Sequence, residues 1–246
     1  MFKLIFNSFL SHVNTKTFGN ATAIILLCAF TTKPVLANVL ISFTDVSNDV
    51  YAKEIQEAVQ TGIIAGFTSN NTFRPTLELT REQMLSMVIN ALSKLSVSPL
   101  TVPYDPPPAA ANLLKVTSKP YRDVKVTRWS AAMIDWAKSN GIILGYSDGT
   151  FRPSQIVTRA ELMAVLHKAA EYGQNAGSSS IGAKQQAVAF SDISNHWAQN
   201  SIKEMSAYCG VASPLNETGN AFSPNLAVKR NYAAAATLRM LNCFKR

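Results

Sequence analysis

The sequence predicts a helical repeat protein built from three helix–loop–helix units. Three observations support this fold class: a Phe-x-Pro motif occurs three times, an arginine follows each proline six residues later, and an apolar, helix-like run follows each arginine. The proline–arginine pairs are Pro75 and Arg81, Pro153 and Arg159, and Pro224 and Arg230. Because the same offset recurs with the same sequel, it marks an internal repeat rather than a chance motif.

The composition is that of a packed chain. Of its 246 residues, 47% are hydrophobic and 15% are charged, which favours a folded core over disorder. The formal net charge is +8, and it falls to +5 without Lys3, Lys16 and Lys33, which precede residue 38. This mild excess suits an acidic polymer as partner. The sequence has no run of adjacent Lys and Arg residues of the kind that follows phosphates, so we expect no nucleic-acid partner.

Residues 1–37 have the pattern of an export signal peptide. Lys3 and Lys16 precede a short apolar stretch at 21–30, and the segment 35–37 offers a cleavage point after Ala37. The alternative is an uncleaved membrane anchor, but the apolar stretch is shorter than the roughly 20 residues that a spanning helix needs. We therefore expect an exported protein, in the periplasm or at the cell wall and cell surface, with no membrane span in the mature chain.

The first repeat is predicted at 43–95 and starts at Phe43. Apolar residues at helical spacing predict a first helix over 51–61, which Gly62 ends. A polar turn at 69–71 leads to the Phe-x-Pro motif, and a second helix is expected from Thr80 to about residue 94. A proline-rich linker follows at 96–120, where six prolines favour extended chain with one or two helical turns near 109–116.

The second repeat is predicted at 121–172 and the third at 190–244. Trp129 stands eight residues after the first aromatic residue of its repeat, as Tyr51 does, so we align these two positions. The sequence at 148–149 is Asp-Gly, a strong turn signal. The segment 173–189 is rich in Gly, Ser and Gln, and we expect it to be a flexible linker.

The second helices of the first two repeats carry a capping signature. Thr158 with Glu161, and Thr80 with Gln83, fit the capping box, in which the threonine hydroxyl accepts from the N3 amide and the N3 side chain reaches back. This structural role is favoured for these residues over ligand contact. The third repeat has lysine at 229 and tyrosine at 232 and therefore lacks the box.

Two cysteines follow the expected cleavage point, Cys209 and Cys243. They could form a disulfide, as cysteines of exported proteins often do, or remain as two buried thiols. If the two helices of the third repeat pack antiparallel, Cys209 lies away from Cys243, whereas parallel or crossed packing could bring them together. The sequence leaves both alternatives open.

Three segments carry a family resemblance: 190–198 (FSDISNHWA), 141–153 (GIILGYSDGTFRP) and 157–161 (VTRAE). They resemble the S-layer homology domain, and the likeness extends over three tandem repeats at 43–244. The resemblance implies an all-α fold in which three helix–loop–helix repeats form a pseudo-threefold arrangement around a central helix bundle. It also implies non-covalent anchoring of exported proteins to the cell wall, through an anionic, often pyruvylated secondary polysaccharide or through peptidoglycan.

Arg81, Arg159 and Arg230 are candidate ligand contacts. A cation in the first turn of a helix opposes the helix dipole, so its presence calls for an explanation. A guanidinium beside the free amides of a helix start can bind a carboxylate. The alternative is a salt bridge to an acid of a neighbouring repeat. We favour ligand contact for Arg81 and Arg159, and the salt bridge for Arg230.

Asp123 and Asp192 complete the candidate set together with Trp129 and Trp197. The aspartates precede the first helices and, judged as carboxylates alone, fit a turn or cap. The resemblance implies that they contact polymer hydroxyls. A partly exposed indole can stack on a sugar ring, whereas core packing is the more common fate of tryptophan. These two readings of the tryptophans stay open at this stage.

The sequence contains none of the common signatures of enzymes. It has no zinc-protease motif, nucleophile elbow, phosphate loop or Cys-x-x-Cys motif. We therefore expect no catalytic activity and no cofactor. The main hypothesis is a wall-anchoring module that binds glycan. The alternative is an envelope structural module that binds protein.

Overall fold

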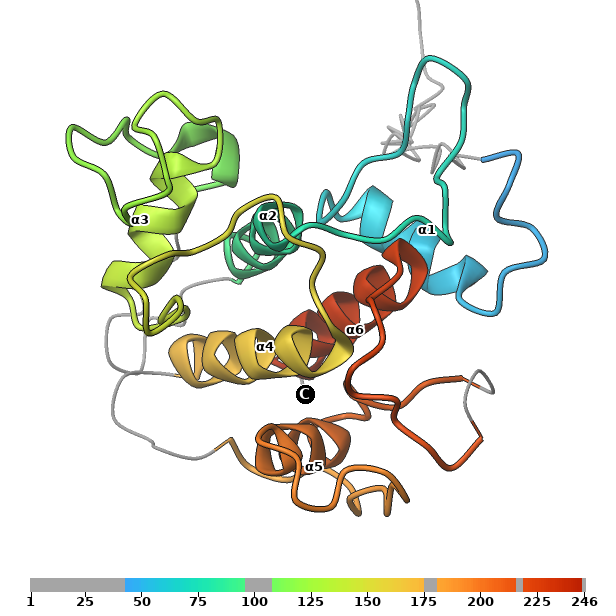
Figure 1. Cartoon of the computed structure of the whole chain (residues 1–246). Coiled ribbons are helices and arrows are strands. Elements are labelled where there is room, and N and C mark those ends of the chain that lie inside the picture. Colours follow the sequence, from blue (N-terminus) through green and yellow to red (C-terminus); the bar gives the residue numbers. More distant parts are fainter. Residues whose placement is uncertain (1–42, 96–107, 175–180, 216–218, 245–246) are drawn as a thin grey trace, which may run out of the picture. The chain divides into compact units, whose positions relative to one another are not determined.

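The computed structural model describes residues 43–95, 108–174, 181–215 and 219–244. The predicted signal peptide lies outside these residues, as do 96–107 and 175–180 of the two linkers. The described helices are α1 (Ala52–Gln60), α2 (Arg81–Leu92), α3 (Ala131–Ser139), α4 (Arg159–Gly173), α5 (Gln199–Ala207) and α6 (Arg230–Cys243), with the short 3-10 helix η1 (Ala110–Asn112) (Figure 1). No strand occurs within the described ranges beyond isolated bridges, so the all-α class is confirmed.

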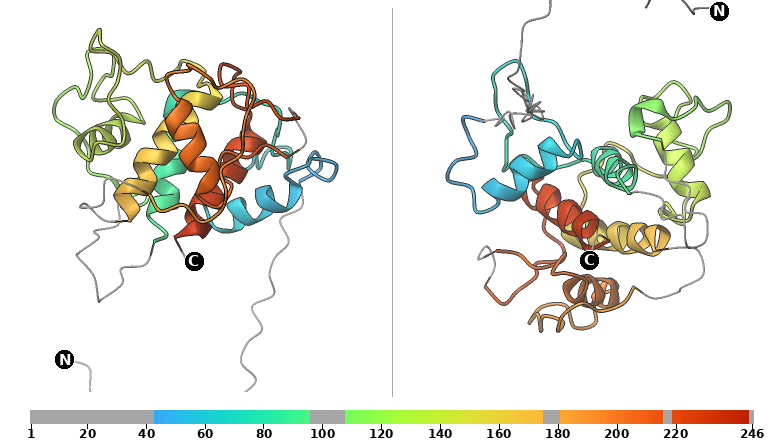
Figure 2. Two further views of the ribbon diagram at one scale, coloured as in Figure 1. Left: turned by 90° about the horizontal axis from the view of Figure 1, so that it is seen from below. Right: turned by 180° about the vertical axis from the view of Figure 1, so that it is seen from behind.

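The second helices of the three repeats, α2, α4 and α6, contact one another (Figures 1 and 2). Each first helix packs mainly on the second helix of the preceding repeat: α3 on α2, α5 on α4, and α1 on α6. The repeats are therefore interleaved, and the first helix of the first repeat packs on the second helix of the last repeat. Of the helices in the described ranges, none is both long and apolar enough to cross a membrane.

A closed ring of backbone hydrogen bonds joins the segments that lead into the three central helices. Leu79 N donates to Val228 O (3.1 Å), Val228 N donates to Val157 O (2.9 Å), and Val157 N donates to Leu79 O (2.9 Å). These three residues are buried, so each bond satisfies groups that water cannot reach. The ring supports the pseudo-threefold arrangement, which stays a prediction.

The core is formed by residues that recur at the same place in each repeat. The phenylalanines of the Phe-x-Pro motifs are fully buried, and each packs on the first aromatic residue of its own repeat. These pairs are Phe73 with Phe43, Phe151 with Tyr121, and Phe222 with Phe190. These six aromatic anchors pack in or against the core, although Phe43 remains partly exposed.

Both predicted capping boxes are present. The hydroxyl of Thr158 accepts from Glu161 N (3.2 Å), and the Glu161 carboxylate accepts from Thr158 N (2.9 Å). Thr80 and Gln83 form the same pair of bonds on α2. On α6, where the box is missing, the side-chain oxygen of Asn231 accepts from the N3 amide of Tyr232 (2.7 Å). A different side chain thus satisfies the amide that the lost threonine would have bound.

We predict that Thr158→Ala lowers the free energy of unfolding by about 0.5–2 kcal/mol, because the N3 amide of α4 loses its acceptor. Thr158→Ser, which keeps the hydroxyl, is the matched control and should stay within about 0.5 kcal/mol of the parent protein. Urea unfolding of the three proteins measures both differences. Equal midpoints for the alanine variant and the parent would show that the cap contributes nothing.

The alignment of Tyr51 with Trp129 is wrong. The residues that flank the helix starts on the N-terminal side are Tyr51 for α1, Ser130 for α3 and Ala198 for α5. Trp129 and Trp197 each lie one residue earlier, and Val50 occupies that position in the first repeat. The second repeat has one extra residue between its first aromatic residue and its helix, which produced the apparent match at equal spacing.

Cys209 and Cys243 form a disulfide, with their Cα atoms 5.8 Å apart. The antiparallel packing considered above, which would have separated them, does not occur, because α5 packs on α4 and α6 packs on α1. The end of α5 and the end of α6 therefore meet at the cysteines. The bridge joins the two halves of the third repeat.

Candidate functional site

The three repeat arginines are buried and connect successive repeats. Each guanidinium donates through Nε to the carbonyl of a Phe-x-Pro phenylalanine in the next repeat around the ring, at 2.8–2.9 Å. The pairs are Arg81 with Phe151, Arg159 with Phe222, and Arg230 with Phe73. Because a buried carbonyl without a donor costs free energy, these bonds explain why a cation persists in the first turn of each helix.

The remaining contacts of the three arginines differ. Arg81 also forms a salt bridge with Glu161 of the neighbouring repeat (3.0 Å), which is the structural alternative considered for it. Arg230 donates to the carbonyl of Ala65 (2.8 Å) rather than to a carboxylate. Burial lowers the pKa of Arg230 to about 10, so it stays charged at neutral pH. The guanidinium of Arg159 lies 3.9 Å from the centre of the Tyr232 ring and lines a surface groove.

The aspartates fix the backbone of the Phe-x-Pro loops. The Asp123 carboxylate accepts from Phe151 N (2.9 Å) and Arg152 N (2.7 Å). Asp192 accepts in the same way from Phe222 N and Ser223 N, both at 2.7 Å. Arg152 and Ser223 have φ of +57°, a conformation that costs free energy for residues other than glycine. Each carboxylate therefore accepts one charge-assisted bond from the strained residue and one from the phenylalanine before it.

Trp129 and Trp197 lie outside the core. Their exposed fractions are 58% and 67%, and they occupy equivalent positions, each one residue before the residue that flanks its helix start. Val50, the third equivalent residue, is 56% exposed. Core packing, the alternative considered for these tryptophans, describes Trp136 instead, which is partly buried and meets Tyr172 edge to face at 5.4 Å between ring centres.

A buried carboxylate holds the segment that carries Trp129. Glu82 of α2 accepts from Arg128 Nε and from one of its terminal nitrogens, both at 2.8 Å, and from the hydroxyl of Ser130. Burial by itself raises the pKa of Glu82, but the hydrogen bonds from Arg128, Ser130 and the Trp129 side chain outweigh it and hold the pKa below its usual range. The hydrogen bonds of Arg128 and Ser130, its two neighbours in the sequence, therefore hold the exposed indole in position.

A groove of about 750 Å³ lies beside this indole. Its walls come from the middle of α2, from the segment around η1 and from the start of α3. Apolar side chains such as Met133 and Leu113 line it together with the amide of Asn90 and the cations Lys115 and Arg128. Such a mixture of an aromatic face, apolar wall and few polar groups suits a ligand that has both apolar and anionic parts.

A second groove, of about 410 Å³, lies at the start of α6. It brings Arg159 together with Lys229, Asn231 and Tyr232 of the third repeat and with Asp49 and Val50 of the first. The Asn231 side chain donates to Asp49 (2.9 Å), so the wall of this groove is fixed by a bond between repeats. Arg159 at the start of α4 and Lys229 at the start of α6 both line this groove, and an anion is favoured at a helix start.

Sequence reasoning missed Asn90 and Lys115, which line the first groove, and Glu82, which binds Arg128 beside it. An acid in the first turn of a helix is expected at the surface because it suits the dipole, so nothing marked Glu82 as buried. The only unusual residue that the sequence showed at this helix start was the neighbouring Arg81, a cation in the first turn. Within the ranges that the structure describes, no group of three or more His, Cys, Asp and Glu side chains could hold a metal ion.

Comparison with known proteins gives a family match in two stretches. The family model of the S-layer homology domain matches residues 42–85 and 120–163. Both matches run from the start of a repeat into its second helix, and the third repeat lies outside them. The matched stretches thus contain the Trp129 segment and the helix starts at Arg81 and Arg159.

Several curated proteins are similar to parts of the chain. "Cell surface glycoprotein 1" of Acetivibrio thermocellus is 34% identical over 127 residues, 51% of this chain and 5% of that protein. The "Cellulosome-anchoring protein" of the same organism is 25% identical over 175 residues, 68% of this chain and 33% of that protein. "Endoglucanase" of Bacillus sp. is 29% identical over 157 residues, 63% of this chain and 15% of that protein. The chain therefore spans a third or less of each of these relatives.

Proposed function

We propose that this chain, whose residues 42–85 and 120–163 match the family model of the S-layer homology domain, binds an anionic polysaccharide of the cell wall, or peptidoglycan, without a covalent bond. The similarity to a cell-surface glycoprotein and to an anchoring protein supports a cell-surface anchoring module. The enzyme names among the relatives belong to proteins of which the matches cover 15% or less. No catalytic role follows from them.

The observation that carries this proposal is the exposed, fixed indole of Trp129 at the edge of a groove with two cations. A sugar ring presents C–H groups that pack on an aromatic face, and an indole held in place loses little conformational freedom on binding. Arg128 is already paired with Glu82, so Lys115 is the cation of this groove that we assign to an acidic substituent of the sugar. Trp197 offers a second, equivalent platform.

The other candidate residues receive different roles in this proposal. Arg159 and Lys229 contact an anion in the second groove. Arg81, Arg230, Asp123 and Asp192 act indirectly, because their hydrogen-bonding groups are engaged with carbonyls, amides or a carboxylate of the protein. They shape the grooves by joining the repeats and by fixing the loops between them.

We predict that Trp129→Ala and Trp197→Ala each weaken binding of solubilised wall polysaccharide by about tenfold, and the double variant by more, because each loses a stacking surface worth roughly 1 kcal/mol or more. Isothermal titration measures the dissociation constants. Trp136→Phe is the control, since it removes an indole that packs inside the protein. Unchanged constants for both folded alanine variants would exclude the tryptophans as the binding platform.

A further inference from the structure

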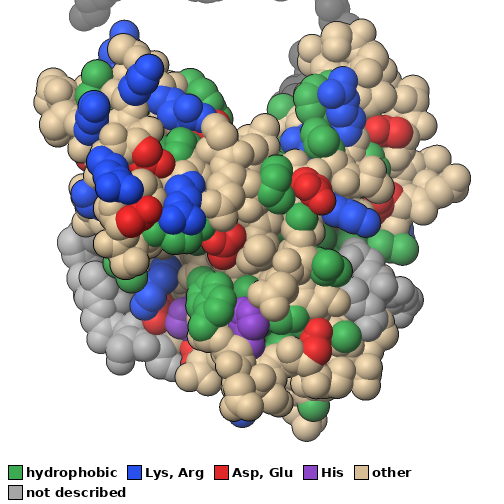
Figure 3. Space-filling model, in the orientation of Figure 1, with side chains coloured by type: hydrophobic (Ala, Val, Ile, Leu, Met, Phe, Trp, Pro, Cys, Tyr) green, Lys and Arg blue, Asp and Glu red, His purple; other side chains and the backbone are tan. Residues whose placement is uncertain are grey.

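The second repeat carries a cluster of cations that its two counterparts lack. The segment 121–128, which leads into α3, contains Arg122, Lys125 and Arg128, whereas the equivalent segments 43–49 and 190–196 contain no Lys or Arg. Lys119, Arg122 and Lys125 are exposed. Figure 3 shows Lys and Arg side chains gathered over the part of the surface that α3 and its flanking loops form. The cations are spaced along the chain, so no charged run marks them in the sequence.

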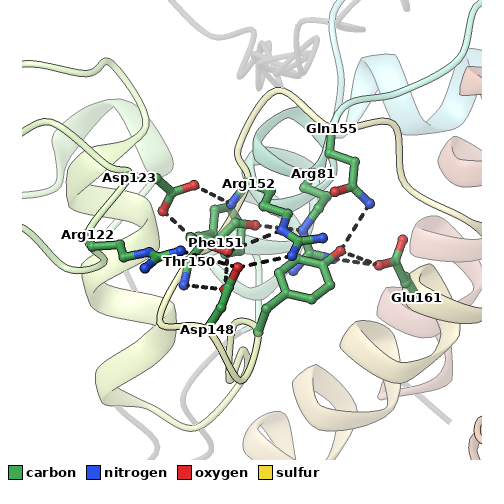
Figure 4. A network of polar contacts seen from close by, with 10 residues as sticks. Arg81, Arg122, Asp123, Asp148, Thr150, Phe151, Arg152, Gln155 and Glu161 are labelled. Carbon is green, nitrogen blue, oxygen red and sulfur yellow. Dashed lines mark hydrogen bonds and ion pairs between the residues drawn. The ribbon is translucent and has the colours of Figure 1, made fainter.

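Two of the arginines in this region share one carboxylate. Asp148 lies 3.1 Å from a terminal nitrogen of Arg152 and 3.4 Å from one of Arg122 (Figure 4). Hydrogen bonds from Thr150 and Arg152 lower the pKa of Asp148 to about 2, so the carboxylate is ionised at neutral pH. Counted together with Lys119 and Lys125, the four cations of this region face two carboxylates, those of Asp148 and Asp123, so two positive charges remain uncompensated at the surface.

The Arg152 guanidinium is held in place. It lies 4.0 Å from the centre of the Tyr146 ring and donates to the hydroxyl of Thr150 (3.2 Å). Its backbone is fixed by the two bonds of Asp123 described above. A cation that is already ordered loses less entropy when it binds an anion than a free lysine does.

Comparison of the repeats shows that the fold does not require these charges. The position of Arg122 is occupied by Thr44 and Ser191 in the other repeats, and that of Arg152 by Arg74 and Ser223. In all three loops the aspartate near the start of the repeat accepts the same pair of hydrogen bonds from backbone amides. Since the third repeat forms these bonds with serine at both positions, neither Arg122 nor Arg152 is needed for them.

We propose that Lys119, Arg122, Lys125 and Arg152 form a basic edge that binds the carboxylate or phosphate groups of a polyanionic polysaccharide. This inference rests on the proposed function, because the polymer is the one whose sugar occupies the groove at Trp129. Lys125 immediately precedes Val126, Thr127 and Arg128, which line that groove. A chain that leaves the groove on this side meets the basic edge next, so the groove recognises a sugar and the edge adds charge-dependent affinity.

The test replaces the two arginines by the residues of the third repeat. The variant is Arg122→Ser with Arg152→Ser, and Arg74→Ser, at the equivalent position of the first repeat, is the matched control. The probe is polygalacturonate, a polymeric carboxylate, with neutral dextran for comparison. We expect roughly fivefold weaker binding of polygalacturonate at low salt for the double variant. The difference should disappear near 1 M salt, where charges are screened beyond about 3 Å, and Arg74→Ser should bind like the parent protein.

Equal affinity of the parent and the double variant at low salt, with unchanged melting temperatures, would overturn the basic edge. An equal loss in Arg74→Ser would overturn it as well, because any surface arginine would then serve. Tighter binding of duplex DNA than of polygalacturonate at the same salt would contradict the choice of a polysaccharide. Failure of the Trp129 and Trp197 variants to affect binding of wall polysaccharide would refute the groove and leave the result at the edge standing, so the two proposals fail separately.

Discussion

Removal of the Cys209–Cys243 disulfide is expected to lower the free energy of unfolding by about 3–4 kcal/mol. The bridge joins residues 34 positions apart, and closing a loop of that size in the unfolded chain accounts for a stabilisation of this order. The effect falls on the third repeat, where α5 and α6 pack on other helices rather than chiefly on each other. Besides the bridge, the ends of α5 and α6 are joined by the edge-to-face contact of Tyr208 with Phe244 and by hydrogen bonds from Arg239 to the carbonyls of Gly210 and Ser213.

The measurement is thermal or urea unfolding of the protein with and without a thiol reductant. Cys209→Ala with Cys243→Ala is the control, because this variant should be less stable than the oxidised parent and should not respond to reductant. Alanine is chosen because Cys243 is buried, with 2% exposed, and a serine there would bury a hydroxyl. Two alkylatable thiols in the untreated protein, or equal midpoints with and without reductant, would contradict the expectation.

Glu82→Ala is expected to cost about 2–4 kcal/mol of stability and to release Trp129. Removal of one partner of a buried ion pair leaves the other charge without compensation. The Arg128 side chain is 30% exposed, against 8% for Glu82, so water recovers part of the loss and we place the effect below that of a fully buried pair. Ser130, which is buried, loses its acceptor at the same time.

Lowering the pH should reproduce part of this loss in the free energy of unfolding, because it protonates Glu82. The pKa of Glu82 in the folded protein lies below its usual value of 4.5. Its contribution to the free energy of unfolding is therefore fully present above pH 4.5 and is lost as the pH falls through the pKa of the folded state. The gap in stability between the parent and Glu82→Gln should therefore shrink below pH 4.5. Glu78→Ala, which removes an exposed acid from the segment before α2, is the control and should change stability by less than about 0.5 kcal/mol.

Two measurements separate the effect of Glu82→Ala on the stability of the protein from its effect on the position of Trp129. Urea unfolding gives the free energy, and the fluorescence anisotropy of the indoles reports whether Trp129 has become mobile. Arg128→Ala should share both effects, since it removes the other half of the pair. A Glu82→Ala variant as stable as Glu78→Ala, with unchanged anisotropy, would show that the buried carboxylate does not hold the indole.

Local features were predictable from the sequence because their chemistry lies within a few residues. Thr158 and Glu161 are three positions apart, so the capping box needs only the helix to form. The turn at Asp148-Gly149 is equally local. The repeat itself was visible because the three Phe-x-Pro motifs keep a fixed distance to the arginines.

Features that depend on contacts between repeats were not predictable. Which first helix packs on which second helix decides whether Cys209 meets Cys243, and spacing along the chain carries no information about that choice. The same holds for Glu82, whose burial depends on α3 and the Arg128 side chain. Arg81 illustrates the limit: its unusual place in a helix start was apparent, but its partners Phe151 and Glu161 come from another repeat.

The function of the tryptophans could be narrowed but not decided. An indole near a helix start fits both a core and a stacking role, and only its exposed fraction separates them. The error over Tyr51 had the same origin, since an aromatic residue eight positions after the repeat start can be buried or exposed depending on one inserted residue. Tyr51 is fully buried, whereas Trp129 is 58% exposed.

Co-sedimentation with purified cell walls tests the central claim most directly. The protein is incubated with intact walls, with walls stripped of their secondary polysaccharide, and with walls digested so that no glycan remains. We predict that the parent protein sediments with intact walls, that Trp129→Ala with Trp197→Ala remains mainly in solution, and that removal of the glycan abolishes sedimentation. Equal sedimentation of the parent protein with material free of glycan would contradict glycan anchoring and would favour a protein partner in the envelope.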